Sequence, residues 1–192
     1  MDVRSRRRLF TAVLVLFAAI SITRLIITTQ GEGGEEATIW IAALIVLAIC
    51  AIVIAVVLRR VRGLAMHVEK QRPGVHVVPA FTTAETVDQA QAAGAATSGI
   101  MPMGGSPVAL AVAGDVVEVW LGRETRPRWV VRRTPGGARS TSGSYGIRGT
   151  TALEVTDGNA AVTVVPAYRP LRATGGRVGE DVERAIREIA VA

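Results

Sequence analysis

Few residues in this 192-residue chain are of a type that carries out chemistry. The chain has two histidines, His67 and His76, and one cysteine, Cys50. Neither histidine has Cys, His or carboxylate neighbours at the spacing of metal ligands. A single cysteine forms neither a disulfide nor a Cys-based metal site within one chain. We therefore expect no metal and no cofactor, and we interpret His67 as an interfacial side chain and His76 as a surface strand residue.

Three short patterns resemble functional motifs: two lack a required part, and the third, a possible carboxylate pair for acid–base chemistry, has a simpler explanation. Residues 142–146 read Ser-Gly-Ser-Tyr-Gly and lack the glycine that a nucleophile elbow has two positions before its serine. Residues 101–106 contain a glycine pair without Gly-Lys-Ser/Thr, which excludes a phosphate-cradling loop. Glu180, Asp181 and Glu183 are best interpreted as charges at the start of a helix. The sequence therefore favours a protein that is not an enzyme.

One stretch stands out by its charge. Residues 123–148 contain seven arginines and one acidic residue, Glu124, so the local net charge is 7 − 1 = +6. The arginines are Arg123, Arg126, Arg128, Arg132, Arg133, Arg139 and Arg148. They form either a solvated face with a mobile loop or a surface for an anionic partner such as lipid headgroups. Trp120 and Trp129, if exposed at a strand edge, would add interfacial contact.

Much of the remaining positive charge flanks two hydrophobic segments, residues 9–29 and 38–58. The second segment has no charged residue, and the first is interrupted only by Arg24. As helices that rise about 1.5 Å per residue, both are long enough to cross a hydrocarbon core of roughly 30 Å. Basic residues placed in this way are typical of a membrane anchor. We therefore expect the lipid bilayer, and not nucleic acid, as a partner.

The flanking charges also predict an orientation. Residues 1–8 carry four arginines, and Arg59, Arg60 and Arg62 follow the second segment, whereas the loop at residues 30–37 is short and acidic. The positive-inside rule places both termini in the cytoplasm and the loop outside, in a multi-pass protein of the cell membrane. A cleaved signal peptide is the alternative for the first segment, and it would leave the C-terminal part in the cytosol.

Arg24 lies about five residues from the outer end of the first segment and must reach water or a partner. It either snorkels outward, where Glu35 or Glu36 would form an outer-end pair with it, or acts as a transport or gating charge. Small residues on both segments would let the two helices approach closely. The same residues would serve a homo-oligomer.

The sequence beyond the second hydrophobic segment predicts a juxtamembrane helix over residues 59–72, followed by a domain over residues 73–192. The first strand of this domain is followed by a capping box at residues 82–85 and a short helix. Residues 134–150, rich in glycine, serine and threonine, are interpreted as a flexible stretch. Strands are expected at residues 75–80, 108–112, 116–121, 128–133, 151–156 and 160–165.

Asp157-Gly158-Asn159 predicts a hairpin between the last two strands, and residues 178–190 predict an amphipathic closing helix. The expected fold class is therefore a two-helix transmembrane hairpin followed by an α+β domain. In that domain, a curved antiparallel sheet or small barrel is closed by the C-terminal helix.

The element order resembles the pleckstrin-homology-like (PH-like) domains of small bacterial membrane proteins that begin with two transmembrane helices. The resemblance is carried by residues 107–121, the strand at 128–133, the Asp157-Gly158 hairpin and the terminal helix, and it covers roughly residues 75–191. The helix after the first strand departs from the pattern. The resemblance implies a binding or scaffolding domain and transfers no functional residue.

Two functions are compatible with this organisation. The first is a membrane-anchored scaffold whose cytosolic domain contacts the inner leaflet or a membrane-protein partner. The alternative is an accessory subunit of a transporter or other membrane complex that acts through its helix hairpin.

Overall fold

The computed structural model describes residues 35–170, 173 and 178–191. The chain divides into two compact units, Met1–Val57 and Leu58–Ala192. The first hydrophobic segment and Arg24 lie outside the described residues. Helix α2 (Glu35–Gln71) contains Glu35 and Glu36, but their side chains also lie outside what the structure describes. The predicted hairpin and its outer-end pair therefore remain predictions.

Helix α2 covers the second hydrophobic segment and the expected juxtamembrane helix without interruption. Among the described residues, one helix is long and apolar enough to cross a membrane, at Ala43–Gln71. Leu47 and Ile52 in its apolar part are 68% and 62% exposed within this chain. Burial begins at Val61, which is 1% exposed. The helix thus changes from an apolar exposed segment to one that packs on protein near the start of the second unit.

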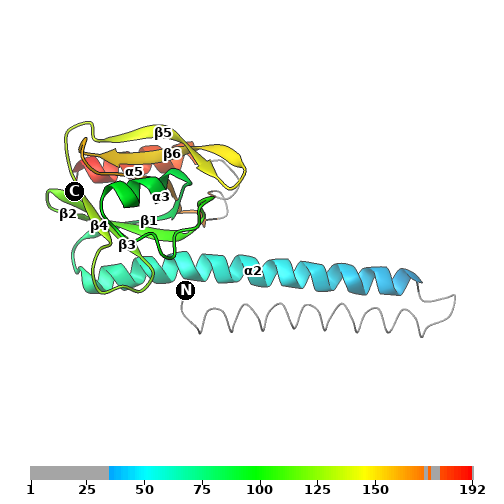
Figure 1. The fold of residues 1–192 in the computed structure, drawn as a ribbon. Coiled ribbons are helices and arrows are strands. Elements are labelled where there is room, and N and C mark those ends of the chain that lie inside the picture. Colours follow the sequence, from blue (N-terminus) through cyan, green and yellow to red (C-terminus); the bar gives the residue numbers. More distant parts are fainter. Residues whose placement is uncertain (1–34, 171–172, 174–177, 192) are drawn as a thin grey trace. The chain divides into compact units, whose positions relative to one another are not determined.

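The second unit is built on one seven-stranded antiparallel sheet with the order β4-β3-β2-β1-β7-β6-β5 (Figure 1). The strands are β1 (His76–Thr82), β2 (Pro107–Ala113), β3 (Val116–Leu121), β4 (Trp129–Arg132), β5 (Ala138–Tyr145), β6 (Arg148–Thr156) and β7 (Ala161–Pro166). The central strand β1 pairs with β2 on one side and with β7 on the other. It therefore joins two meanders, each formed by strands consecutive in sequence.

Helices α3 (Glu85–Ala92) and α5 (Gly179–Val191) pack against the sheet, in addition to the last turns of α2. The strands are rich in valine, whose branched side chain suits a pleated surface, and alternate side chains face the core. Val182, Ala185 and Ile189 share one face of α5 because they recur at spacings of three and four. They join the main core of buried residues, which includes Val78, Leu110, Val119, Val131, Leu153 and Val164.

The sheet curls into a half-barrel, so that β4 meets the turn between β6 and β7. Asp157 Oδ2 accepts a hydrogen bond from the backbone N–H of Arg132 at 3.0 Å. The indole N–H of Trp129 donates to the carbonyl oxygen of Ala161 at 3.3 Å. Four strands lie between β4 and β6 in the sheet order, so only a curled sheet permits these contacts. The predicted curved antiparallel sheet with a C-terminal helix is confirmed.

The Asp157-Gly158 hairpin is also confirmed. Asp157 Oδ1 accepts hydrogen bonds from the N–H groups of Asn159 and Ala160, and Gly158 has the positive φ of +87° that this turn requires. These backbone donors, together with that of Arg132, hold the pKa of Asp157 below its ordinary value. The carboxylate therefore both closes the hairpin and fastens the curled edge.

The interpretation of residues 134–150 as a flexible stretch is wrong. They contain β5 and the start of β6, which pair in unbroken register from Ala138 with Val155 to Tyr145 with Arg148. The small polar side chains of β5 lie at the edge of the sheet and show no apolar alternation. Main-chain pairing with β6 therefore forms this strand without the side-chain pattern by which strands are predicted.

The predicted capping box at residues 82–85 is wrong as well. Ala84 is the N-cap of α3 and makes no side-chain cap hydrogen bond. The N–H of Thr83 donates instead to Thr86 Oγ1 at 2.9 Å. The carboxylate of Glu85 accepts from the N–H of Ser144 at 3.0 Å, so it fastens the helix to β5.

Gly143 is the buried residue of β5, and replacing it tests this packing. A Cβ there would lie 3.0 Å from both Ala152 Cβ and Thr83 Cγ2, whereas a Cβ at Gly149 would have no atom within 4 Å. Neither glycine has a positive φ. We expect Gly143→Ala to lower the free energy of unfolding by about 1–3 kcal/mol, because the hairpin must move.

The matched control is Gly149→Ala, which we expect to leave stability unchanged or slightly raised. The measurement is chemical unfolding of the full chain in detergent, followed by tryptophan fluorescence. Equal stability of the two variants would contradict the packing of β5 described above.

Candidate functional site

The last turns of α2 lie on the outer face of the sheet and form a docking face. Leu64, Ala65 and Val68 recur at helical spacing and are at most 9% exposed. The docking face consists of these three residues on α2 and Val77, Ala109, Ala111 and Trp120 on β1, β2 and β3. The compact unit accordingly begins at Leu58 and not at the expected residue 73, because this part of α2 packs on the sheet.

A polar cluster borders the docking face. Nε and Nη2 of Arg72 donate to the two carboxylate oxygens of Glu118 at 3.0 and 2.7 Å. The indole N–H of Trp120 donates to Glu118 Oε2 at 3.0 Å, and the guanidinium of Arg72 lies 5.9 Å from the Trp120 ring centroid. Glu118 is only 6% exposed, and a buried carboxylate is costly unless its charge is compensated. Here the bidentate Arg72 guanidinium and the Trp120 indole N–H compensate it.

The two tryptophans are buried, so they do not meet the condition of exposure under which they would add interfacial contact. Trp120 is 1% exposed and belongs to the docking face, and Trp129 is 6% exposed and belongs to the main core. The sequence could not distinguish a tryptophan at an exposed strand edge from one that a helix covers. Trp120 is covered by α2, which is distant in sequence from β3, whereas Trp129 packs in the main core.

The loop between β3 and β4, residues 122–128, is held by contacts with α2 and with the loop before β2. Nε2 of His67 on α2 lies 2.9 Å from the carbonyl oxygen of Glu124. Arg128 forms an ion pair with Glu124, and its Nη1 donates to the carbonyl oxygens of Ala96 and Ser98 at 2.6 and 3.0 Å. The β3–β4 loop is therefore fixed at two points.

The structure divides the seven arginines of residues 123–148 into two groups. Arg128 is bound as described, Arg133 donates to the carbonyl oxygen of Gly114 at 2.6 Å, and Arg139 pairs with Glu154 at 2.6 Å. The other four are exposed, and within the described part of the chain their side chains form no hydrogen bond or ion pair. These four are Arg123, Arg126, Arg132 and Arg148.

The four exposed arginines do not lie together. Arg123 and Arg126 are on the β3–β4 loop, which contacts α2, whereas Arg132 pairs with Val116 at the opposite end of β3. Arg148 stands at the turn between β5 and β6. The stretch is therefore continuous in sequence and divided in space, because the chain crosses the sheet between its members.

Arg60 on α2 lies on the same side of the helix as His67, which contacts the β3–β4 loop. It is exposed and precedes His67 by seven residues, about two helical turns, so both lie on one side of α2. We call Arg60, Arg123 and Arg126 the basic surface. Its cations come from two elements, which the contact between His67 and Glu124 joins.

His76 takes part in a polar network at the other helix. Its Nε2 lies 2.8 Å from Glu188 Oε2 on α5, and Tyr168 donates its hydroxyl to the same carboxylate. Arg184 donates to Glu188 Oε1 at 2.7 Å and lies over the Tyr168 ring. Burial raises the pKa of Glu188, but these hydrogen bonds outweigh burial and hold it below its ordinary value. The network fastens α5 to β1 and the segment after β7.

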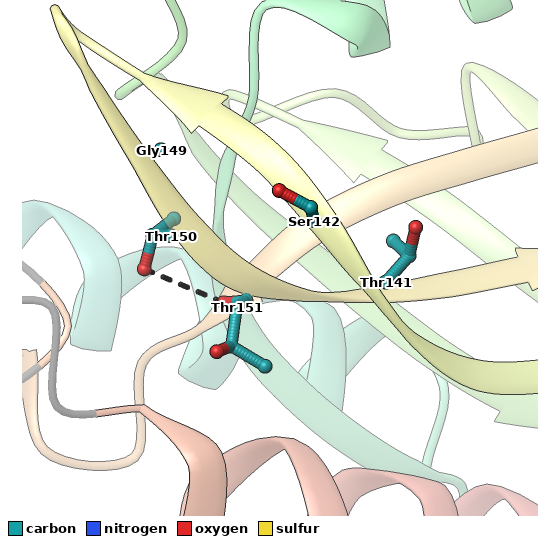
Figure 2. Close-up of a pocket in the computed structure, with 5 residues that line it drawn as sticks. All are labelled: Thr141, Ser142, Gly149, Thr150 and Thr151. Atoms are coloured by element: carbon teal, nitrogen blue, oxygen red, sulfur yellow. Dashed lines mark hydrogen bonds between the residues drawn. The ribbon is translucent and has the colours of Figure 1, made fainter.

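A shallow hollow lies on the β5–β6 hairpin (Figure 2). It is lined by Thr141, Ser142, Gly149, Thr150 and Thr151. The hydroxyl groups of Ser142 and Thr150 point in different directions in Figure 2. No ionisable or aromatic side chain is among the lining residues, and no group of three or more metal-ligating side chains occurs in the described ranges.

Comparison with known protein families, curated proteins and solved structures finds no match for this chain. The site is therefore interpreted from its geometry alone.

Sequence reasoning missed three exposed apolar residues, Met101, Met103 and Ile147, which are 51%, 53% and 91% exposed. They lie in glycine-rich stretches without apolar periodicity, and Met101 directly follows the buried Ile100. The signal available was an isoleucine in the two-residue turn Gly146-Ile147.

Replacement of Glu118 tests the polar cluster at the docking face. Glu118→Gln keeps the volume but removes the charge that the Arg72 guanidinium and the Trp120 indole face. We expect it to lower the free energy of unfolding by about 1–3 kcal/mol, as measured by chemical unfolding of the full chain.

The matched control is Glu154→Gln. Its partner Arg139 is 62% exposed, and an exposed ion pair contributes about 0–1 kcal/mol. A Glu118→Gln variant no less stable than the control would contradict the role assigned to this cluster.

Proposed function

We propose that this protein is a membrane-anchored, non-catalytic binding or scaffold protein. In this proposal α2 crosses the cell membrane as the second helix of a hairpin with residues 9–29. Both termini lie in the cytosol, and the curled-sheet domain contacts the inner leaflet. The observation that carries the proposal is that one helix is apolar and exposed at first and then packs on the domain through the docking face.

The exposed apolar part of α2 supports a bilayer as its surroundings. Leu44, Leu47 and Ile52 are each more than 60% exposed within this chain. Transfer of each such side chain from water to an apolar medium is favourable by about 1.5–3 kcal/mol. The segment at residues 38–58 has no charge and suits a hydrocarbon core of roughly 30 Å.

The basic surface supports anionic lipid headgroups as the partner. His67 follows Leu58 by nine residues, which is about 14 Å along a helix. If the hydrocarbon core ends near Leu58, the β3–β4 loop lies close to the headgroups. Arg123 and Arg126 are exposed cations without an internal partner in the described part of the chain. Each such cation near an anionic membrane contributes on the order of 1 kcal/mol.

The curled sheet with its closing helix supports a binding domain similar to PH-like domains. Its interior is filled by its own apolar side chains. Fold alone does not define function, so the proposal rests on the helix and the basic surface.

The orientation is tested by labelling one cysteine from either side of the membrane. Asn159 is exposed in the β6–β7 turn. In a Cys50→Ala background, Asn159→Cys should react with a membrane-impermeant maleimide in inside-out vesicles and not in intact cells. Labelling of this cysteine in intact cells would contradict the cytosolic placement of the domain.

The basic surface is tested by energy transfer from a dye on Thr125→Cys, in the β3–β4 loop, to acceptor lipids. The full chain is reconstituted in phosphatidylcholine vesicles with or without phosphatidylglycerol. We expect transfer to rise with the anionic lipid and Arg123→Glu to remove most of that rise, because the cation becomes an anion.

Arg132→Glu is the matched control, since Arg132 is also exposed but lies at the opposite end of β3. It should keep the rise. Loss of the rise in both variants would point to net charge alone and count against a defined basic surface.

A further inference from the structure

Three exposed apolar side chains gather on two adjoining turns. Met101 and Met103 lie in the loop before β2, and Ile147 lies in the turn between β5 and β6. They are 51%, 53% and 91% exposed, respectively. We call these three residues the apolar tip. Single exposed apolar residues are ordinary on protein surfaces, but a group on adjoining turns indicates an interaction site.

Main-chain contacts hold the two turns together. The N–H of Gly146 donates to the carbonyl oxygen of Met103 at 2.7 Å. A Cβ at Gly105 would lie 3.3 Å from Met101 Cε and 3.7 Å from the Tyr145 hydroxyl. The loop and the hairpin turn are therefore in direct contact.

The base of the tip is well packed. The rings of Tyr145 and Phe81 meet edge to face, with centroids 5.9 Å apart. The hydroxyl of Ser106 accepts from the N–H of Met101 and donates to the carbonyl oxygen of Gly99, both at 2.9 Å. The apolar side chains are thus presented by fixed backbone, which lowers the entropy lost when they bind.

The tip is continuous with the basic surface. The loop that carries Met101 and Met103 also supplies the carbonyl oxygens of Ala96 and Ser98, which Arg128 binds. Arg128 belongs to the β3–β4 loop, which contacts α2. The apolar tip and the basic surface therefore follow each other along one side of the second unit.

We propose that the apolar tip inserts into the interfacial layer of a bilayer that contains anionic lipids. The proposal rests on the proposed function and names the contact that completes it. Ile147 and the two methionines would enter the boundary between headgroups and acyl chains. Arg148, exposed and without an internal partner in the described residues, follows Ile147 directly and would meet a lipid phosphate.

The charge around the tip favours lipid over a protein partner. The exposed ionisable side chains on the two turns and the β3–β4 loop are Arg148, Arg123 and Arg126, whereas the partly buried Glu85 beside the hairpin is bound to the N–H of Ser144. An apolar point flanked by cations matches a surface with anionic headgroups above an apolar layer.

The test places an environment-sensitive nitrobenzoxadiazole dye on Ile147→Cys in the full-length Cys50→Ala chain. The protein is reconstituted in phosphatidylcholine and phosphatidylglycerol vesicles with or without nitroxide-labelled lipid. We expect blue-shifted emission and quenching by nitroxide lipid several-fold greater than for the same dye on Asn159→Cys. Asn159 is the matched control because its turn fastens to the far end of β4 through Asp157.

The outcomes separate this inference from the proposed function. If the dye at 147 remains as accessible to aqueous iodide as the dye at 159 while lipid transfer still depends on Arg123, insertion is refuted and the basic surface stands. Protection from iodide without quenching by nitroxide lipid would show that protein covers the tip, which also overturns the proposal. If transfer is independent of Arg123 as well, both fail.

Discussion

The docking of α2 on the outer face of β1, β2 and β3 is the interaction on which the rest of the second unit depends. A curled sheet encloses one apolar face and leaves the other outside. Here the outer face carries Trp120, Ala109 and Ala111, which are at most 1% exposed only because α2 covers them. Without the helix, an indole and an apolar strip would face water. The helix is therefore part of the fold of this unit.

The same interaction decides how a buried charge is tolerated. Glu118 faces outward on β3 toward the docking face, where an unpaired carboxylate would be costly. Arg72, in the turn just after α2, supplies two donors, and Trp120 supplies a third. These contacts fix where the helix ends on the sheet. A separate contact, between His67 on α2 and the carbonyl oxygen of Glu124, fixes the β3–β4 loop. It therefore also fixes the position of the basic surface relative to the last turns of α2.

The sequence predicted those parts of the fold that local pattern determines. The valine alternation of β2 and β3, the Asp157-Gly158 turn and the helical spacing of Val182, Ala185 and Ile189 are local signals, and each was confirmed. The strand β5 was missed because its residues are small and polar, and its order comes from pairing with β6.

The candidate site was less predictable for the same reason. The arginine-rich stretch was visible in the sequence, but the exposure of each arginine depends on partners distant along the chain, such as Ala96 for Arg128 and Glu154 for Arg139. The sequence left open whether the two tryptophans are exposed, because the residues that cover them are also distant along the chain. The apolar tip forms only where two loops meet, so the isoleucine in the Gly146-Ile147 turn could indicate one member of it but not the group.

The most direct test of this account is amide hydrogen exchange along α2 in the full chain reconstituted in lipid. If α2 is docked as described, the amides of residues 61–71 should exchange as slowly as those of β1. The reason is that both segments exchange only when the whole second unit unfolds. The docking face also predicts that Trp120→Ala speeds exchange in that segment. Fast exchange at residues 61–71 beside a protected β1 would contradict the docking of the helix, and with it the placement of the basic surface.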